Sequence, residues 1–144
     1  MKHRFLVVLS VLCGLALAAP LFAHHGATRW ERDKTATISG QVRQFDWQNP
    51  HPLLLLDVKN DAGVVETWAI EFHPPGVMNR GLGWTRKTFQ PGDQVKVSGH
   101  PEKANLPLTN GFKSLRPLKV TFSNGAVHTV DPPGAGKIEQ AGGY

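Results

Sequence analysis

Hydrophobic and polar residues alternate near the start of the predicted domain with the two-residue period of a β-strand. Between residues 35 and 47, Ala36, Ile38 and Val42 fall on one face, and the odd-numbered residues between them are polar. Phe45 has the opposite parity, so the apolar side changes after Val42. A change of this kind is typical of a β-bulge, because one extra residue moves every following side chain to the other face. We therefore expect a long first strand that bends after Val42.

Short apolar runs separated by turn sequences predict the remaining strands. Pro50 and Pro52 predict a turn before the second strand, because neither can donate a ladder hydrogen bond. Residues 60–63 form a hairpin sequence, and Val64 is expected to share a face with the apolar residues Trp68, Ile70 and Phe72 of the strand that follows. The expected strands after the first are 53–58, 64–72, 95–99, 112–122 and 126–130.

The segment between the third and fourth of these strands has a different pattern. Pro75 suits the first turn of a helix, Met78 and Leu82 can supply its buried side, and Gly83 can end it. Trp84 is expected to cover the core. An order of three strands, one short helix and two or three strands predicts an all-β domain, a small OB-like Greek-key β-barrel. An open β-sandwich is the alternative.

The first 23 residues have the pattern of a secretory signal peptide. Lys2 and Arg4 give a basic start, an apolar run follows to Ala19, and Ala23 is a small residue suited to signal-peptidase cleavage. The apolar run is shorter than the roughly 20 residues that a membrane-spanning helix needs. We therefore expect a protein that is periplasmic or secreted, with no stable membrane insertion after processing.

Cleavage after Ala23 divides the 144-residue chain into four parts. The signal peptide is 1–23, and an irregular N-terminal arm of residues 24–34 leads into the barrel domain at 35–130. Residues 131–144 are rich in Gly and Pro without apolar periodicity, which predicts a flexible tail.

Composition narrows the chemistry of the processed chain. Cys13 is the only cysteine and lies within the signal segment, so disulfides, thiol nucleophiles and cysteine zinc sites are excluded after cleavage. Lys2 and Arg4 are also removed, which leaves 14 basic against 11 acidic residues. A scattered charge of this size does not favour nucleic acid as a partner.

Several short motifs together resemble a known family. They are His24-His25-Gly26, Phe45-Asp46-Trp47-Gln48-Asn49-Pro50-His51, Trp68-Ala69-Ile70-Glu71, Gly83-Trp84-Thr85-Arg86 and Gln90-Pro91-Gly92-Asp93-Gln94-Val95. The chain is similar over residues 24–122 to a secreted bacterial family of unknown function, domain of unknown function 6152. The resemblance implies an exported small β-protein and brings no established activity.

Histidines supply the candidate chemistry of the processed chain. A cut after Ala23 makes His24 the first residue, whose α-amine and imidazole can chelate a metal together. His25 follows it, His51 is expected in the loop after the first strand, and His100 at the start of the loop after the fourth. OB barrels bind ligands through these two loops. Nitrogen-rich sites suit Cu(II), so one hypothesis is a copper-binding module with His24, His25, His51 and His100 as ligands.

The alternatives need no metal. His24 and His25 can belong to a loose terminus, and His51 can hold a turn between two prolines. We find no nucleophile elbow, zinc-protease motif or phosphate loop, so we expect no enzyme and no catalytic residue. The second hypothesis is therefore a metal-independent interaction module. It would bind a small molecule, a peptide or an envelope partner through an apolar surface formed by Trp30, Trp47, Trp84 and the loop around Leu106. The oligomeric state stays open.

Overall fold

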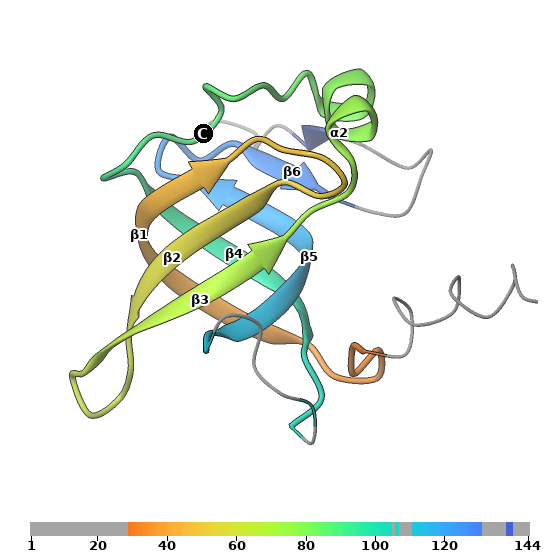
Figure 1. Cartoon of the computed structure of the whole chain (residues 1–144). Coiled ribbons are helices and arrows are strands. Elements are labelled where there is room, and N and C mark those ends of the chain that lie inside the picture. Colours follow the sequence, from red (N-terminus) through yellow and green to blue (C-terminus); the bar gives the residue numbers. More distant parts are fainter. Residues whose placement is uncertain (1–28, 105, 107–110, 131–137, 140–144) are drawn as a thin grey trace, which may run out of the picture.

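The computed structural model describes residues 29–104, 106, 111–130 and 138–139 (Figure 1). The predicted signal segment 1–23 and the candidate ligands His24 and His25 lie outside the described residues. The elements in chain order are β1 (Ala36–Asp46), β2 (Leu53–Lys59), β3 (Val65–Glu71), α2 (Pro75–Leu82), β4 (Gln94–Pro101), β5 (Lys113–Phe122), β6 (Val127–Thr129) and β7 (Ile138–Glu139).

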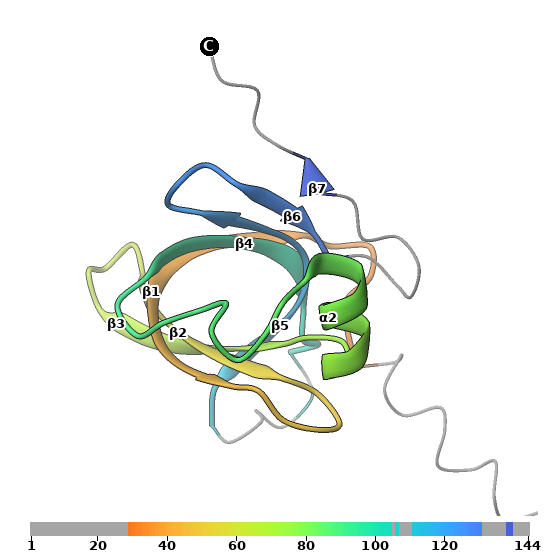
Figure 2. The ribbon, with the colours of Figure 1, turned by 90° about the horizontal axis from the view of Figure 1, so that it is seen from above.

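Five strands close into a barrel, as Figures 1 and 2 show. The order of pairing is β3-β2-β1-β4-β5, and β5 returns to β3 through a parallel pairing in which Ile70 lies beside Leu115. The other barrel pairings are antiparallel. One short helix lies between β3 and β4. This confirms the predicted small OB-like barrel and excludes the open sandwich.

The predicted bend in β1 makes this closure possible. The first half of β1 pairs with β4 and the second half with β2, and the register shifts between Val42 and Gln44. Val42 still pairs with Leu56 of β2, and Arg43 is the extra residue. On the β4 side, the Val42 N–H donates to Asp93 O and its carbonyl accepts from Gly92 N, both at 2.8 Å. A bulge increases local twist. One strand can therefore serve two sides of the barrel.

Side chains from all five barrel strands and α2 fill the interior. The buried apolar cluster contains Ile38, Val42, Leu54, Leu56, Ile70, Phe72, Met78, Leu82, Trp84, Phe89, Val95, Val97, Leu115, Val120 and Val130. The expectation for Val64 was wrong, since this residue is 58% exposed. Asn60 explains the difference: its Oδ1 accepts hydrogen bonds from the N–H groups of Ala62 and Val64, which keeps Val64 within the turn.

Helix α2 lies at one end of the barrel (Figure 1). Pro75 occupies its first turn, and Met78 and Leu82 are buried. The helix ends at Gly83, whose φ of 68° is left-handed and whose N–H donates to the carbonyl of Asn79. Glycine adopts this conformation without steric cost. The following residue, Trp84, is 2% exposed and covers the core as predicted.

The structure differs from the prediction at the end of β4 and in the C-terminal segment. β4 continues past Gly99 to Pro101, so His100 lies within the strand rather than in the loop after it. A strand pair also occurs inside the predicted tail, where Ile138 of β7 pairs with His128 of β6. The rest of that tail lies outside the described residues. Among the residues that are described, no helix has the length and apolar character needed to cross a membrane.

Candidate functional site

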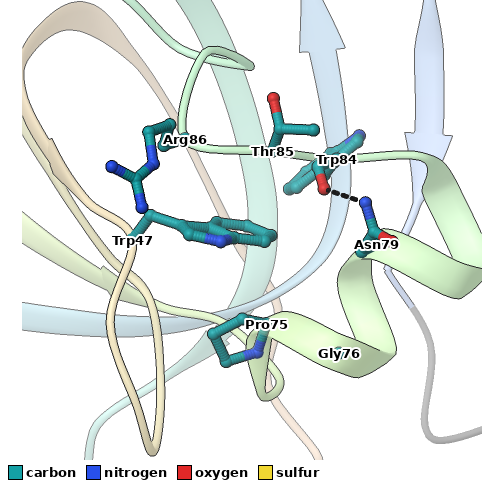
Figure 3. A pocket seen from close by; sticks show the side chains of 7 residues that line it. All are labelled: Trp47, Pro75, Gly76, Asn79, Trp84, Thr85 and Arg86. Atoms are coloured by element: carbon teal, nitrogen blue, oxygen red, sulfur yellow. Dashed lines mark hydrogen bonds between the residues drawn. The ribbon is translucent and has the colours of Figure 1, made fainter.

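A concave site lies between the β1–β2 loop and the segment that contains α2. We call it the Trp47 pocket, and its volume is about 290 Å³. Figure 3 shows Trp47 and Arg86 on one side of the opening and Asn79 on the other. The lining residues are Trp47, Pro75, Gly76, Asn79, Trp84, Thr85 and Arg86. They come from two chain segments that the barrel brings together.

The wall formed by α2 and the following segment is held by backbone and side-chain hydrogen bonds. Asn79 Nδ2 donates to Trp84 O at 3.0 Å, as Figure 3 shows. The Thr85 N–H donates to the Thr88 hydroxyl at 2.8 Å, which closes a turn after Trp84. These bonds fix the backbone around Gly83 and Trp84. The side chains of Thr85 and Arg86 therefore extend from a well-defined base.

Aromatic contacts connect the Trp47 pocket to the core. Trp47 is half-buried, and its ring centroid lies 5.8 Å from that of Phe45. Phe45 contacts Phe89 at 4.9 Å, and Phe89 contacts Trp84 at 5.1 Å. The last two pairs are edge-to-face and the pair of Trp47 with Phe45 is tilted by 59°. Such packing restricts the orientation of each ring. The Trp47 ring is thus a rigid platform with one side turned to the pocket.

Trp84 is held from behind by β6. Its Nε1–H donates to Nδ1 of His128 at 2.7 Å. An indole N–H can only donate, so His128 Nδ1 must be the unprotonated nitrogen of a neutral ring. Burial lowers the pKa of His128 from its ordinary value of 6.5, which also favours the neutral form. The back wall of the pocket therefore depends on a histidine that must stay uncharged.

The Trp47 pocket has a positive electrostatic character. Arg86 is the charged residue of its lining, and no acidic side chain lines it. In the described part of the chain, Arg86 makes no ion pair or hydrogen bond. Asp46 is the acid next in sequence to a lining residue, Trp47, and its Oδ1 accepts from Gln44 Nε2 at 2.7 Å.

The candidate ligand His51 lies in a different place. Its Nδ1 is 2.8 Å from Phe72 O, so Nδ1 carries the hydrogen and Nε2 is the nitrogen with a lone pair. His51 lines a small cavity of about 20 Å³, which has room for roughly one water molecule. The residues around this cavity are Trp30, His51, Glu71, Phe72, His73 and Arg116.

His100 has a similar bond but different surroundings. Its Nδ1 lies 2.8 Å from Lys34 O, which again leaves Nε2 as the nitrogen with a lone pair. His100 lies opposite Arg116 in the pairing of β4 with β5. Arg116 also lines the cavity of His51, so a permanent positive charge is common to both surroundings. Across the described ranges, no three His, Cys, Asp or Glu side chains have an arrangement that could hold a metal ion.

The described part of the N-terminal arm is fixed to the barrel. Trp30 is 4% exposed and forms a β-bridge with Glu102. Arg29 Nε donates to Glu102 Oε1 at 2.6 Å, and Arg29 Nη1 lies 4.0 Å from Glu71 Oε2. The second carboxylate oxygen of Glu102 is buried without a hydrogen-bond partner. Arg29, the first described residue, therefore lies close to Glu71, which shares a cavity with His51.

The proposed aromatic surface is only partly formed. Trp47 lines a pocket, but Trp30 and Trp84 are buried, and their indole rings serve mainly as core. Sequence reasoning missed Asn79 and Arg86 as site residues. Arg86 follows Trp84 and Thr85 in one of the distinctive motifs, which was the available signal. Its proximity to Trp47 depends on the barrel and could not be obtained from spacing.

Comparison with known protein families identifies the family of this chain. The sequence model of DUF6152, a family of unknown function, matches residues 11–109. The chain belongs to the DUF6152 family. The match covers β1 to β4 and α2, and therefore every residue that lines the Trp47 pocket. No curated protein matches the chain.

Proposed function

We propose that this DUF6152 protein is an exported, non-enzymatic binding module that holds a small molecule in the Trp47 pocket. The observation that carries the proposal is a half-buried tryptophan ring at the rim of an open, shallow pocket of about 290 Å³. Ligand pockets commonly combine an apolar or aromatic wall with a few placed polar groups. Here Trp47 and Pro75 supply the apolar wall, and Asn79, Thr85 and Arg86 are the polar groups.

The size of the pocket favours a small molecule over a protein partner. A volume of about 290 Å³ lies at the lower end of the range for ligand pockets. Peptide recognition by strand addition would require a long free sheet edge. In the barrel β3 pairs with β5 over residues 68–70, which shortens the free edge of β3 that such a peptide could use.

Rigidity is a second argument for binding. The Trp47 ring packs against Phe45, and the opposite wall is fixed by the hydrogen bond from Asn79 to Trp84. A ligand that stacks on a ring already held in place loses less free energy to ordering of the protein. Stacking of a planar group on an aromatic ring contributes about 0.5–1.5 kcal/mol beyond its area burial.

The test uses a planar apolar probe with no charge. N-phenyl-1-naphthylamine becomes fluorescent when it leaves water, so its binding to the purified, processed protein can be titrated. We expect saturable one-to-one binding that W47L abolishes. The matched control is W68L, because Trp68 is also half-buried but lies on β3 beside Lys113, away from the pocket lining. No saturable binding to the folded protein, or equal loss in W68L, would contradict the proposal.

Export is part of the same proposal and has its own measurement. The basic start, apolar run and small residue at Ala23 support cleavage after that position. We expect the mass of the protein recovered from the periplasm or medium to correspond to residues 24–144. A protein that retains residues 1–23 in the cytoplasm would contradict it.

A second candidate function is Cu(II) binding through His24, His25, His51 and His100. The observation in its favour is the tautomer of His51, whose Nδ1–H is bonded to a backbone carbonyl while Nε2 remains for a metal. Metal-ligating histidines usually have such a bond. His24 precedes Arg29 by five residues, a span of at most about 17 Å, and Arg29 lies beside Glu71 next to the His51 cavity.

Copper alone is the probe for this candidate. We expect one equivalent of Cu(II) to give a nitrogen-rich electron paramagnetic resonance spectrum with the processed chain. H24A or H51A should remove it, as should one extra residue before His24. H128N is the matched control, because His128 lies in β6 behind Trp84. Weak, nonstoichiometric binding to a chain with a verified His24 terminus would exclude copper.

A further inference from the structure

We infer that the ligand of the Trp47 pocket is a planar molecule that carries an anionic group, bound by the guanidinium groups of Arg86 and Arg80. This inference rests on the proposed function and adds the chemical class of the ligand. The anionic group can be a carboxylate, a sulfonate or a phosphate, since all three accept paired hydrogen bonds from arginine.

The charge of the lining is the first observation. Arg86 contributes one positive charge, and none of the seven lining residues is acidic. An exposed arginine often pairs with a neighbouring carboxylate, but Arg86 has no such partner in the described part of the chain. Its five N–H donors are therefore available to an incoming acceptor.

Arg80 does not line the pocket, but its guanidinium group lies beside Gly76, which does. A methyl group placed on Gly76 would lie 3.3 Å from Arg80 Nη1, so the Arg80 side chain folds back along α2 against Gly76. Gly76 itself lines the Trp47 pocket. The absence of a side chain at Gly76 leaves this space to the guanidinium. Arg80, like Arg86, forms no ion pair in the described residues.

The arrangement of the two charges and the ring defines the shape of the ligand. Trp47 and Arg86 lie on the same side of the opening in Figure 3, and Gly76 lies at the start of α2 below them. A flat group on the Trp47 ring would place an attached anion next to Arg86 and toward Gly76. A cation in the pocket would meet the guanidinium of Arg86 and no carboxylate. The pocket therefore selects against cations.

Two fluorescent probes that share their aromatic part provide the test. 1-Anilinonaphthalene-8-sulfonate carries a sulfonate, and N-phenyl-1-naphthylamine is its uncharged counterpart. We expect the sulfonate probe to bind at least tenfold more tightly to the processed protein. R86Q and R80Q should each weaken binding of the sulfonate probe by about three- to tenfold, and each should weaken binding of the neutral probe by a smaller factor. Higher ionic strength should reduce the difference in affinity between the two probes, because exposed charges are screened.

Controls separate this inference from the proposed function. K119Q removes an exposed positive charge on β5 that does not line the pocket, and it should change neither probe by more than twofold. Each variant is first checked for a cooperative thermal transition. One outcome is that W47L abolishes binding of the neutral probe while R86Q and R80Q leave the affinity for the sulfonate probe unchanged. In that case the pocket binds ligands, and the anionic class of the ligand is wrong. If K119Q weakens the sulfonate probe as much as R86Q does, general charge attraction explains the binding and the inference is overturned.

Discussion

The hydrogen bond between Trp84 and His128 gives a prediction that joins stability, pH and the Trp47 pocket. H128F keeps an aromatic ring beside Trp84 and Phe122, whose centroids lie 5.6 Å and 5.1 Å from the histidine ring. It removes the acceptor for Trp84 Nε1–H. Trp84 is 2% exposed, so the N–H would be left largely without water. An unsatisfied buried donor costs about 1–3 kcal/mol, and we expect H128F to lose that much free energy of unfolding at pH 7.5.

H128N is the opposite change, because it keeps a hydrogen-bond acceptor for Trp84 and loses the aromatic ring. Its side-chain oxygen can accept from Trp84, but the ring contacts disappear, which costs about 0.5–1.5 kcal/mol. The two variants thus separate the hydrogen bond from the packing. Urea denaturation followed by tryptophan fluorescence measures both, provided that the slope with denaturant stays constant.

The pH dependence of H128F follows from the direction of the pKa shift. Burial lowers the pKa of His128 below 6.5 in the folded protein. As the pH falls through 6.5, the unfolded chain takes up a proton at this residue while the folded protein does not. The wild-type protein therefore loses stability below pH 6.5, and H128F lacks this contribution. The stability gap between them should be smaller at pH 5.5 than at pH 7.5. A gap that widens on acidification, or no destabilisation by H128F at pH 7.5, would refute the reasoning.

Further predictions concern the barrel closure and the anchored arm. G99A should cost at least about 3 kcal/mol, because the added methyl group would lie 2.1 Å from Arg116 O across the β4–β5 ladder. G81A is its control: nothing lies within 4 Å of that position, and the helix should gain up to about 1 kcal/mol. R29M should cost about 2–4 kcal/mol by leaving the Glu102 carboxylate, 5% exposed, without its cation. Adding E102M to R29M should recover part of that loss in chemical denaturation, whereas a double variant less stable than R29M would contradict the pairing.

Local patterns predicted the architecture because each element is specified by nearby residues. The parity change after Val42 predicted the bulge, which is found as a register shift between Val42 and Gln44. Pro75 and Gly83 predicted the ends of the helix closely. The error at Val64 has a local cause as well, since apolar alternation cannot show that Asn60 holds this residue in the turn. The pairing of Ile138 with β6 had no signal in a segment rich in Gly and Pro.

The site was less predictable because it depends on contacts between distant segments. Trp47 and Arg86 are separated by 39 positions in the sequence and meet only through the barrel. Tryptophan identity alone could not separate Trp47, at the rim, from Trp30 and Trp84 in the core. The bond from His51 to Phe72 O depends on how β2 and β3 are aligned, because Leu53 pairs with Glu71. The expectation that His51 lies in the loop after the first strand therefore could not give its tautomer. It also could not show that Arg116 lines the same cavity.

The most direct test of the central claim follows the side-chain N–H signals of the tryptophans in ¹H–¹⁵N spectra during titration with the neutral naphthylamine probe. W47F and W68F assign the two half-buried residues. We predict a large, saturable shift of the Trp47 side-chain signal and of the backbone amide signals of Gly76 and Thr85. The side-chain signals of Trp68 and Trp30 should change little. Shifts centred on Trp30 and the amides around His51, with Trp47 unmoved, would contradict the Trp47 pocket as the binding site.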